Sequence, residues 1–294
     1  MTECRAARWE TRTRKPIDPA SLPRLKAWLT VRTEPAWRRD AFASGLEAAG
    51  YRVTSNSIEA PAPEDVIVTW NRQGSFHESA CRFERAGAMV LVAENGYLGR
   101  EDQRGGPWYA IARNQHNGAG VWPVGDGSRW ASWGIKLAPW RPISDGHVLV
   151  LPQRGIGPSG VAMPQGWADR LKIDTDRPVR VRAHPGRAEI KPLDDDLSGA
   201  WCCVTWGSGA AIKALLAGIP VFHAMPDWIG GPAARLMERD VSEPFLGDRL
   251  PMFERMAWAQ WTLAEIAAGD PFRRLLNAHT DHRPRHLWKL EDSR

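Results

Sequence analysis

The stretch WCCVTWGSGAAIKALLAGIPVF, residues 201–222, contains a complete strand, turn and helix, followed by the start of a second strand. Its apolar beginning, WCCVTW, predicts a buried strand, and SGAAIKALLAG (208–218) predicts a helix that follows almost at once. Ser208 stands where an N-cap residue belongs, and Gly207 and Gly209 leave room for a ligand beside the first helical turn. Unpaired N–H groups and the helix dipole make such a turn a phosphate site. The pattern is equally typical of a capped turn with nothing bound.

The second half of the chain repeats this alternation of strands and helices on both sides of the quoted stretch. HVLVLPQ (147–153), VRVRAHP (179–185) and IPVFHA (219–224) each predict a further strand. Strands that alternate with helices indicate parallel pairing in a doubly wound sheet, whose ligands bind at the carboxyl ends of the strands. The remaining elements expected in this half are helices over 166–174 and 251–275 and a short helix or turn over 193–199.

Polar side chains stand at the ends of two of these strands. Gln153 and Arg154 come at the end of the first strand, before a glycine-rich turn, and Arg182 and His184 end the second. A histidine with a pKa near neutrality can donate a proton to a leaving phosphate, although a lone His-Pro is also a common strand end. With the turn after residue 206, these strand ends predict a phosphate-binding edge. The residues expected to bind the phosphate-bearing ligand there are Gln153, Arg154, Gly155, Arg182, Thr205, Gly207, Ser208 and Gly209.

The first half of the chain shows the same alternation. A helix is expected over 35–49, strands over 51–54 and 65–70, a helix over 75–87 and a strand over 88–93. This half therefore predicts a second doubly wound sheet.

The first half also contains a candidate general base and candidate acceptor residues. The strand over 88–93 runs into Glu94, beside a glycine turn, and a carboxylate in that place can take a proton, although a Glu that caps a turn looks the same. Polar loops follow the strand over 65–70 and lie within the irregular stretch 97–146. The acceptor-binding residues expected there are Trp70, Asn71, Arg72, His116 and Asn117. The spacing of these residues indicates no metal site, and the missing GxGxxG and GxxxxGK[ST] motifs argue against a dinucleotide dehydrogenase or a P-loop kinase.

Length and charge suggest how the chain divides. A chain of 294 residues can build two α/β domains of ordinary size. Residues 1–40 hold ten Arg or Lys against five acidic residues, whereas the remaining 29 basic residues are matched by 29 acidic ones. The predicted division is a basic N-terminal arm over 1–34, an acceptor-side domain over 35–142 and a ligand-binding domain over 143–294. Such an arm either contacts polyanions or is a solvated tail.

The four cysteines, Cys4, Cys81, Cys202 and Cys203, show no CxxC spacing. We expect buried thiols in a reducing compartment, which predicts a cytoplasmic protein. No stretch approaches the ~18 consecutive apolar residues that span a bilayer, and the N-terminus lacks the apolar core of a secretory signal. The sequence therefore predicts no stable membrane insertion, and it leaves the oligomeric state open.

Three of these motifs occur in an order that resembles a known group of enzymes. Glu94-Asn95-Gly96, then His184-Pro185, then the turn from Thr205 to Ser208 before a helix are similar to motifs of GT-B glycosyltransferases. The similar enzymes are those related to the bacterial sialyl- and Kdo-transferases of capsule and lipooligosaccharide synthesis. ALLAGIPV (214–221) is similar to part of their donor-site helix and the strand after it.

This resemblance implies two Rossmann-like α/β domains that face a cleft, the GT-B arrangement. It also implies that Glu94 is the catalytic base, that His184 contacts the leaving phosphate of the donor and that Ser208 binds phosphate. The chain departs from the group at the base, because the group usually has two adjacent acids before the glycine, where this chain has Ala93-Glu94-Asn95.

The expected function is therefore transfer of a sugar from a nucleotide-sugar, most simply a UDP-sugar, to an acceptor hydroxyl. The donor is a substrate, no cofactor or metal is expected, and the reaction should invert the anomeric centre. A non-catalytic sugar- or nucleic-acid-binding protein of the same fold is one alternative. Another α/β enzyme, such as an epimerase or a nucleotide hydrolase, is a further one.

The prediction of the acceptor comes from the amino-acid composition of the chain and not from a motif. The basic arm, 32 Arg and 16 Trp resemble the viral enzymes that glycosylate hydroxymethylated bases in DNA, which also have a GT-B fold. The predicted acceptor is a 5-hydroxymethylpyrimidine in DNA, a bacteriophage-type modification in the host cytoplasm, and a capsule-type glycan is the alternative. A flipped base would stack on indole rings. The tryptophans expected to supply these rings are Trp70, Trp108, Trp122 and Trp130.

Overall fold

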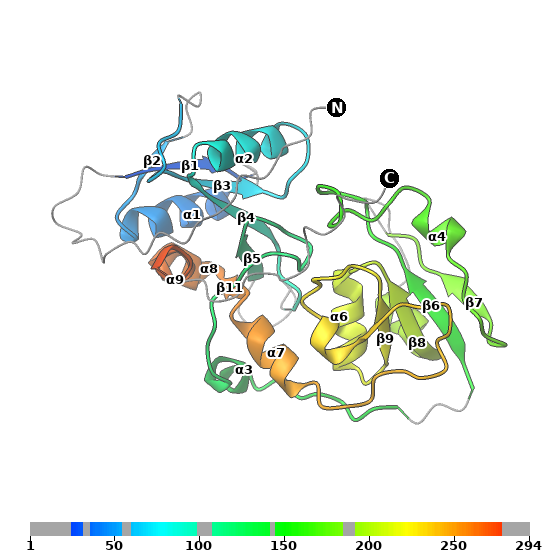
Figure 1. The fold of residues 1–294 in the computed structure, drawn as a ribbon. Coiled ribbons are helices and arrows are strands. Elements are labelled where there is room, and N and C mark those ends of the chain that lie inside the picture. Colours follow the sequence, from blue (N-terminus) through cyan, green and yellow to red (C-terminus); the bar gives the residue numbers. More distant parts are fainter. Residues whose placement is uncertain are drawn as a thin grey trace. The chain divides into compact units, whose positions relative to one another are not determined.

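The computed structural model describes residues 25–31, 36–54, 60–98, 108–141, 145–184 and 192–277 (Figure 1). These residues form two compact units, each with its own sheet. The first unit contains the described chain up to His116, Gly120–Pro123 and the described chain from Ala259 onward; the second contains Asn117–Ala119 and Val124–Trp258. The predicted α/β class with two separate, largely parallel sheets is confirmed. The expectation that the two domains face a cleft stays a prediction.

The first unit is built on a six-stranded sheet with the strand order β11-β5-β4-β3-β1-β2. The first four strands in the sequence pair in parallel, β5 runs antiparallel to β4, and β11 runs antiparallel to β5. All five residues of β3 are buried, as expected for a central strand that is covered on both faces. The strands are β1 (Lys26–Thr30), β2 (Arg52–Thr54), β3 (Val66–Trp70), β4 (Met89–Asn95), β5 (Trp108–Arg113) and β11 (Gln260–Thr262).

The helices of the first unit are α1 (Ala36–Ala48), α2 (Ser75–Arg85), α8 (Leu263–Ala268) and α9 (Asp270–Asn277). A close approach joins α1 to α8. A Cβ added to Gly45 would lie 1.8 Å from the carbonyl oxygen of Ile266, so only glycine lets the two helices meet there. A capping box starts α8: the Thr262 hydroxyl accepts from Glu265 N at 3.2 Å, and the Glu265 carboxylate accepts from Thr262 N at 2.8 Å.

The second unit has a five-stranded, fully parallel sheet with the order β10-β9-β8-β6-β7. The strands are β6 (His147–Leu151), β7 (Val179–Val181), β8 (Ala200–Thr205), β9 (Val221–His223) and β10 (Arg235–Leu236). The helices are α3 (Ser128–Trp133), α4 (Trp167–Arg170), α5 (Leu193–Leu197), α6 (Gly209–Leu216) and α7 (Leu250–Ala257), with a 3-10 turn η1 (Gly231–Ala233). Val148, Val150, Cys202, Val204 and Phe222 of the three central strands belong to one hydrophobic cluster of this unit, and α6 packs on β8 and β9 (Figure 1).

The predicted division of the chain differs from the observed one at both ends. Lys26–Thr30, expected within a basic arm, is β1, and it pairs with both β2 and β3 inside the first sheet. The part of the arm before residue 25 lies outside the described residues. The region after Ala259 was expected to close the second domain, but β11 pairs with β5 and so returns the chain to the first unit. Sheet pairing decides both cases, because each strand contributes its hydrogen bonds to the sheet in which its partner lies.

Three of the four cysteines lie among the described residues, and Cys81, Cys202 and Cys203 are free and buried, as predicted. Burial raises the pKa of Cys202 to about 12 and that of Cys203 well above its ordinary value. Cys4 lies outside the described residues. Within the described part of the chain, every helix is too short or too polar to cross a bilayer.

Candidate functional site

The turn between β8 and α6 is closed by the side chain of Thr205. The Thr205 hydroxyl donates to Leu151 O at 2.8 Å and accepts from Ser208 N at 2.8 Å. Ser208 is the N-cap of α6, and its hydroxyl accepts from Ala210 N at 3.3 Å. Two of the predicted phosphate ligands are therefore already engaged in holding the turn, and Thr205 is fully buried.

Gly209, the first residue of α6, is the open point of this turn. A Cβ added there would meet no atom within 4 Å, and no described residue accepts a hydrogen bond from Gly209 N. The N-terminus of a helix carries about half a positive charge and is a natural anion site. The first turn of α6 can therefore bind a phosphate through backbone N–H groups.

Gln153 follows β6 and lies directly beside this turn. Its Nε2 donates to Gly207 O at 2.6 Å, and its Oε1 is buried without a hydrogen bond from any described residue. Gly207 is tightly enclosed, since a Cβ there would lie 2.7 Å from Met225 Cε and 3.3 Å from Gln153 Nε2. The predicted association of Gln153 with the glycine turn is thus present in the structure.

The loop after Gln153 contains two of the predicted ligand-binding residues. Gly155 has a φ of +64°, in the left-handed region that favours glycine, and Arg154 is exposed. Asn117, predicted to bind the acceptor, instead belongs to this unit and donates from Nδ2 to Ile156 O at 2.8 Å. Asn117 therefore belongs to the unit that contains the predicted phosphate edge.

Arg182 and His184 follow β7, the strand next to β6. Arg182 N donates to Val150 O at 3.0 Å, and its guanidinium forms an ion pair with Asp196 of α5. That carboxylate offsets the positive charge that the sequence predicted at this edge. His184 is exposed and is the last residue of its described segment.

His223, at the end of β9, is a polar residue of this edge that the sequence analysis did not select. It is 5% exposed, and its Nδ1 lies 2.8 Å from Met225 O. Burial lowers the pKa of His223, so the ring is neutral near pH 7. A signal was available in the sequence, because IPVFHA places this histidine at the end of the strand that follows the glycine turn.

In the first unit, Glu94 lies within β4 and not beyond its end, and it pairs with Ala110 of β5. The Tyr97 hydroxyl donates to Glu94 Oε1 at 3.1 Å. Gln260 of β11 holds the turn that carries Tyr97, since its Oε1 accepts from Tyr97 N at 2.8 Å and from Leu98 N at 3.0 Å. No local pattern indicates this clamp, because Gln260 is 163 residues away from Tyr97.

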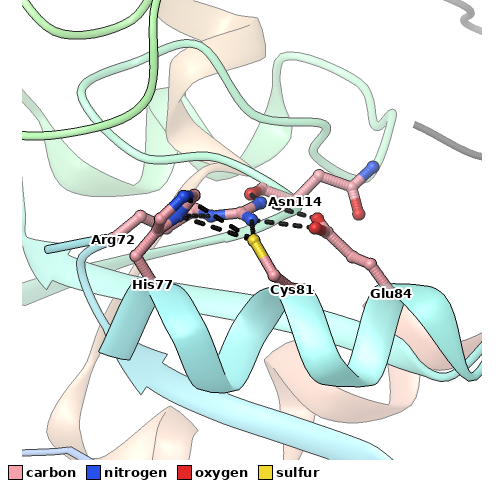
Figure 2. A network of polar contacts seen from close by, with 5 residues as sticks. All are labelled: Arg72, His77, Cys81, Glu84 and Asn114. Atoms are coloured by element: carbon pink, nitrogen blue, oxygen red, sulfur yellow. Dashed lines mark hydrogen bonds and ion pairs between the residues drawn. The ribbon is translucent and has the colours of Figure 1, made fainter. Parts of the chain in front are cut away.

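Arg72, predicted to bind an acceptor, uses all five of its N–H groups inside the first unit (Figure 2). Nε donates to His77 Nδ1 at 3.3 Å, and Nη1 donates to Glu84 Oε1 at 2.6 Å and to Asn114 O at 2.7 Å. Nη2 donates to Glu84 Oε2 at 2.8 Å and to Cys81 Sγ at 3.6 Å. Burial, and then the charge of Arg72, lower the pKa of His77. This arrangement favours a structural role for Arg72, because no donor remains for a ligand.

The other acceptor candidates in the first unit are also covered. Trp70 is 5% exposed, and the Arg38 guanidinium lies 4.6 Å from the centre of its ring. His116 is 3% exposed, and Asn71 is half-buried with a φ of +58°. Trp108, Trp122 and Trp130, expected with Trp70 to offer stacking faces for a base, are buried as well. Their indole rings fill the cores of the units, which removes this support for a DNA acceptor.

The described residues contain no group of three or more His, Cys, Asp or Glu side chains that could hold a metal ion. The second unit does bring most of the predicted ligand-binding residues together at the carboxyl ends of adjacent strands. Glu94 and the remaining acceptor candidates belong to the first unit.

The Arg72 network predicts a loss of stability and not of ligand binding when it is broken. Arg72→Leu leaves the half-buried Glu84 carboxylate without its partner, which should lower the free energy of unfolding by about 3 kcal/mol. Urea denaturation followed by circular dichroism measures this change. The control is Arg82→Ala, at an exposed position of α2, the helix that contains Glu84. An Arg72→Leu variant with normal stability but impaired use of an acceptor would restore the predicted binding role.

A scan against protein-family models and a search of curated proteins each found no match. Among solved structures, the chain is similar to KpsC from Thermosulfurimonas dismutans, described as a β-Kdo 2,7 transferase. The TM-score is 0.49 and the identity 15%, over 85% of this chain and 99% of that chain. A second KpsC structure from the same organism, described as a β-Kdo 2,4 transferase, gives a TM-score of 0.49 and 14% identity over 82% and 91% of the two chains.

Proposed function

We propose that this chain is a glycosyltransferase that binds a nucleotide-sugar at the carboxyl edge of its second sheet. The observation that carries the proposal is the first turn of α6, where Gly209 N is open and the flanking strand ends present polar side chains. Such a turn suits the phosphate of a nucleotide-sugar, because backbone N–H groups and the helix dipole both favour negative charge. A UDP-sugar is the proposed donor, and the reaction is proposed to need neither a metal nor another cofactor.

In the proposed reaction, Glu94 takes the proton of the acceptor hydroxyl. The acceptor oxygen forms a bond to the anomeric carbon, and the bond from that carbon to the phosphate oxygen breaks with its electron pair going to the phosphate. Attack opposite the leaving group inverts the anomeric centre. The N-terminus of α6 stabilises the growing charge on the phosphate, and His184 supplies a further hydrogen-bond donor.

The acceptor is proposed to be a glycan in preference to a hydroxymethylated base in DNA. The DNA prediction depended on a basic arm and on exposed indole rings, and the four rings expected to stack on a base are buried. Free, buried thiols support a reducing compartment such as the cytoplasm as the place of reaction.

The donor site can be tested by placing a charge at its open point. Gly209→Asp puts a carboxylate at the N-terminus of α6, where the helix dipole favours it and where the structure leaves room, so the fold should keep its stability. The same charge repels a phosphate, and binding of UDP, CMP or GDP should weaken at least ~10-fold, which is about 1.4 kcal/mol. The neutral Gly209→Asn variant is the matched control, and titration calorimetry measures both. Equal affinities in the two variants would place the phosphate elsewhere.

The catalytic roles predict two distinct kinetic changes. Glu94→Gln should keep donor affinity and lose transfer by ~10²–10⁴-fold, the usual contribution of a general base. His184→Ala should lower kcat more than it weakens donor binding, since a leaving-group contact strengthens in the transition state. Initial rates with the nucleotide-sugar that binds in the calorimetry, together with Asn95→Ala as a neighbouring control, measure both effects. Normal turnover in Glu94→Gln would move the base to another residue.

The acceptor class can be decided by product mass. The protein is incubated with UDP-, CMP- and GDP-sugars, in one arm with oligosaccharides and in the other with duplex DNA that contains hydroxymethylcytosine or hydroxymethyluracil. We expect a mass gain of one sugar on an oligosaccharide. A gain on the digested nucleosides would return the acceptor to DNA, and donor binding with no transfer in either arm would support a non-catalytic binding protein. Release of free sugar without any acceptor would indicate a hydrolase.

A further inference from the structure

Two side chains at the carboxyl edge of the second sheet have their hydrogen-bonding roles fixed by backbone carbonyl groups. Gln153 points one end of its amide at Gly207 O, at 2.6 Å. A carbonyl oxygen can only accept, so the NH₂ group of Gln153 must face it and Oε1 must face the other way. Oε1 is therefore an acceptor, and it is buried with no hydrogen bond from the described residues.

His223 is fixed in the same manner. Its Nδ1 lies 2.8 Å from Met225 O, so Nδ1 carries the proton and donates it to that carbonyl. The ring is neutral, because burial lowers its pKa, and Nε2 is left with a lone pair. His223 is 5% exposed, and the described residues supply no donor to Nε2. The ring lies beside Trp228, with ring centres 5.5 Å apart, and Nε2 faces Gly231, where a Cβ would lie 3.4 Å away.

These two acceptors flank the phosphate turn. The strands β6, β8 and β9 are neighbours, with Leu151 paired to Thr205 and Thr205 paired to His223. Each strand is about 4.8 Å from the next. The same turn contacts both sides, since a Cβ on Gly207 would lie 3.3 Å from Gln153 Nε2 and 3.2 Å from Trp228 Cδ1. Gln153 therefore lies on one side of the turn, and the loop over His223 lies on the other.

While the His223 ring is neutral, neither atom can donate a hydrogen bond to phosphate. Ionised phosphate oxygens accept hydrogen bonds and have no proton to donate, so two acceptors beside them gain nothing from the phosphate itself. Gln153 Oε1 is buried without a donor, which is costly, so a hydroxyl or an N–H group on the ligand is its natural partner. A neutral His223 Nε2 accepts hydrogen bonds from the same kinds of group. A nucleotide-sugar has hydroxyl groups on both sides of its phosphates, on the ribose and on the transferred sugar.

We propose that Gln153 Oε1 and His223 Nε2 each accept a hydrogen bond from a hydroxyl of the donor, one from each of the two sugars that its phosphates join. This inference rests on the proposed function, and it adds His223 to the binding site as a residue that selects the donor. The phosphate is then bound by backbone N–H groups, and Gln153 and His223 bind the sugars on either side of it.

Two variants of His223 test the roles of its two ring nitrogen atoms separately. In His223→Asn the amide nitrogen can replace Nδ1 toward Met225 O, but no acceptor reaches the place of Nε2. In His223→Gln the amide oxygen can replace Nε2 as an acceptor. Melting temperatures close to that of the unmodified protein would show that both variants keep the fold. Gln153→Met, which keeps the length of the side chain and removes its polar atoms, is the corresponding variant on the other side.

The test is titration calorimetry of each variant with UDP and CMP, their 2′-deoxy and 3′-deoxy forms, and UDP- and CMP-sugars. If His223 contacts the ribose, His223→Asn weakens binding of the ribonucleotide about 10-fold, and His223→Gln recovers part of this affinity. In His223→Asn, removal of the contacted ribose hydroxyl then causes no further loss, so one deoxy form binds as well as the ribonucleotide. Gln153→Met then weakens binding of the nucleotide-sugar but not of the nucleotide. The reversed pattern would assign the ribose to Gln153 and the transferred sugar to His223.

Two outcomes would overturn the inference while leaving the donor site in place. One is unchanged affinity for every nucleotide and nucleotide-sugar in both His223→Asn and Gln153→Met. The other is weaker binding of inorganic pyrophosphate by His223→Asn, which would mean that this residue contacts the phosphate. If the unmodified protein binds none of these nucleotides, the proposed function fails, and this inference fails with it.

Discussion

The hydroxyl group of Thr205 connects three elements of the second unit through two hydrogen bonds. It donates to the last carbonyl of β6 and accepts from the backbone at the start of α6. A hydroxyl can do both at once, whereas a methyl group of the same shape can do neither. Because the end of β8 is tied to β6 in this way, Gln153 comes to lie against Gly207 and the first turn of α6 opens at the edge of the sheet.

The predicted site residues differ in how their polar groups are satisfied. Two of the arginines are paired with carboxylates, Arg72 with Glu84 and Arg182 with Asp196. Such pairing offsets the cost of taking a charge out of water. Gln153 Oε1, by contrast, is buried and receives no hydrogen bond from the described residues. Native proteins satisfy most buried polar atoms, and under the proposed function a hydroxyl of the donor supplies the hydrogen bond that this atom lacks.

The elements that were predicted well carry a strong local pattern. The helix over 35–49 and the strands over 65–70 and 147–153 were recognised because apolar residues recur at the spacing of their structure, and α1, β3 and β6 lie within those ranges. β5 lies within a stretch expected to be irregular, and β11 within one expected to be helical. β11 has only three residues, too few for any period, and it is a strand because β5 offers it a partner.

Local sequence patterns were enough to predict several strand ends and helix starts, including the turn at Gly207 to Gly209 and the polar residues around it. Apolar periodicity and capping residues act over a few positions, so they can be read locally. Which polar side chains already have a hydrogen-bond or ion-pair partner within the protein could be seen only in the tertiary structure. Arg72 forms an ion pair with Glu84, Arg182 forms one with Asp196, and Nδ1 of His223 donates a hydrogen bond to Met225 O. These outcomes depend on the packing geometry around each side chain, which no local pattern records, and that packing decides which donors and acceptors remain for a ligand.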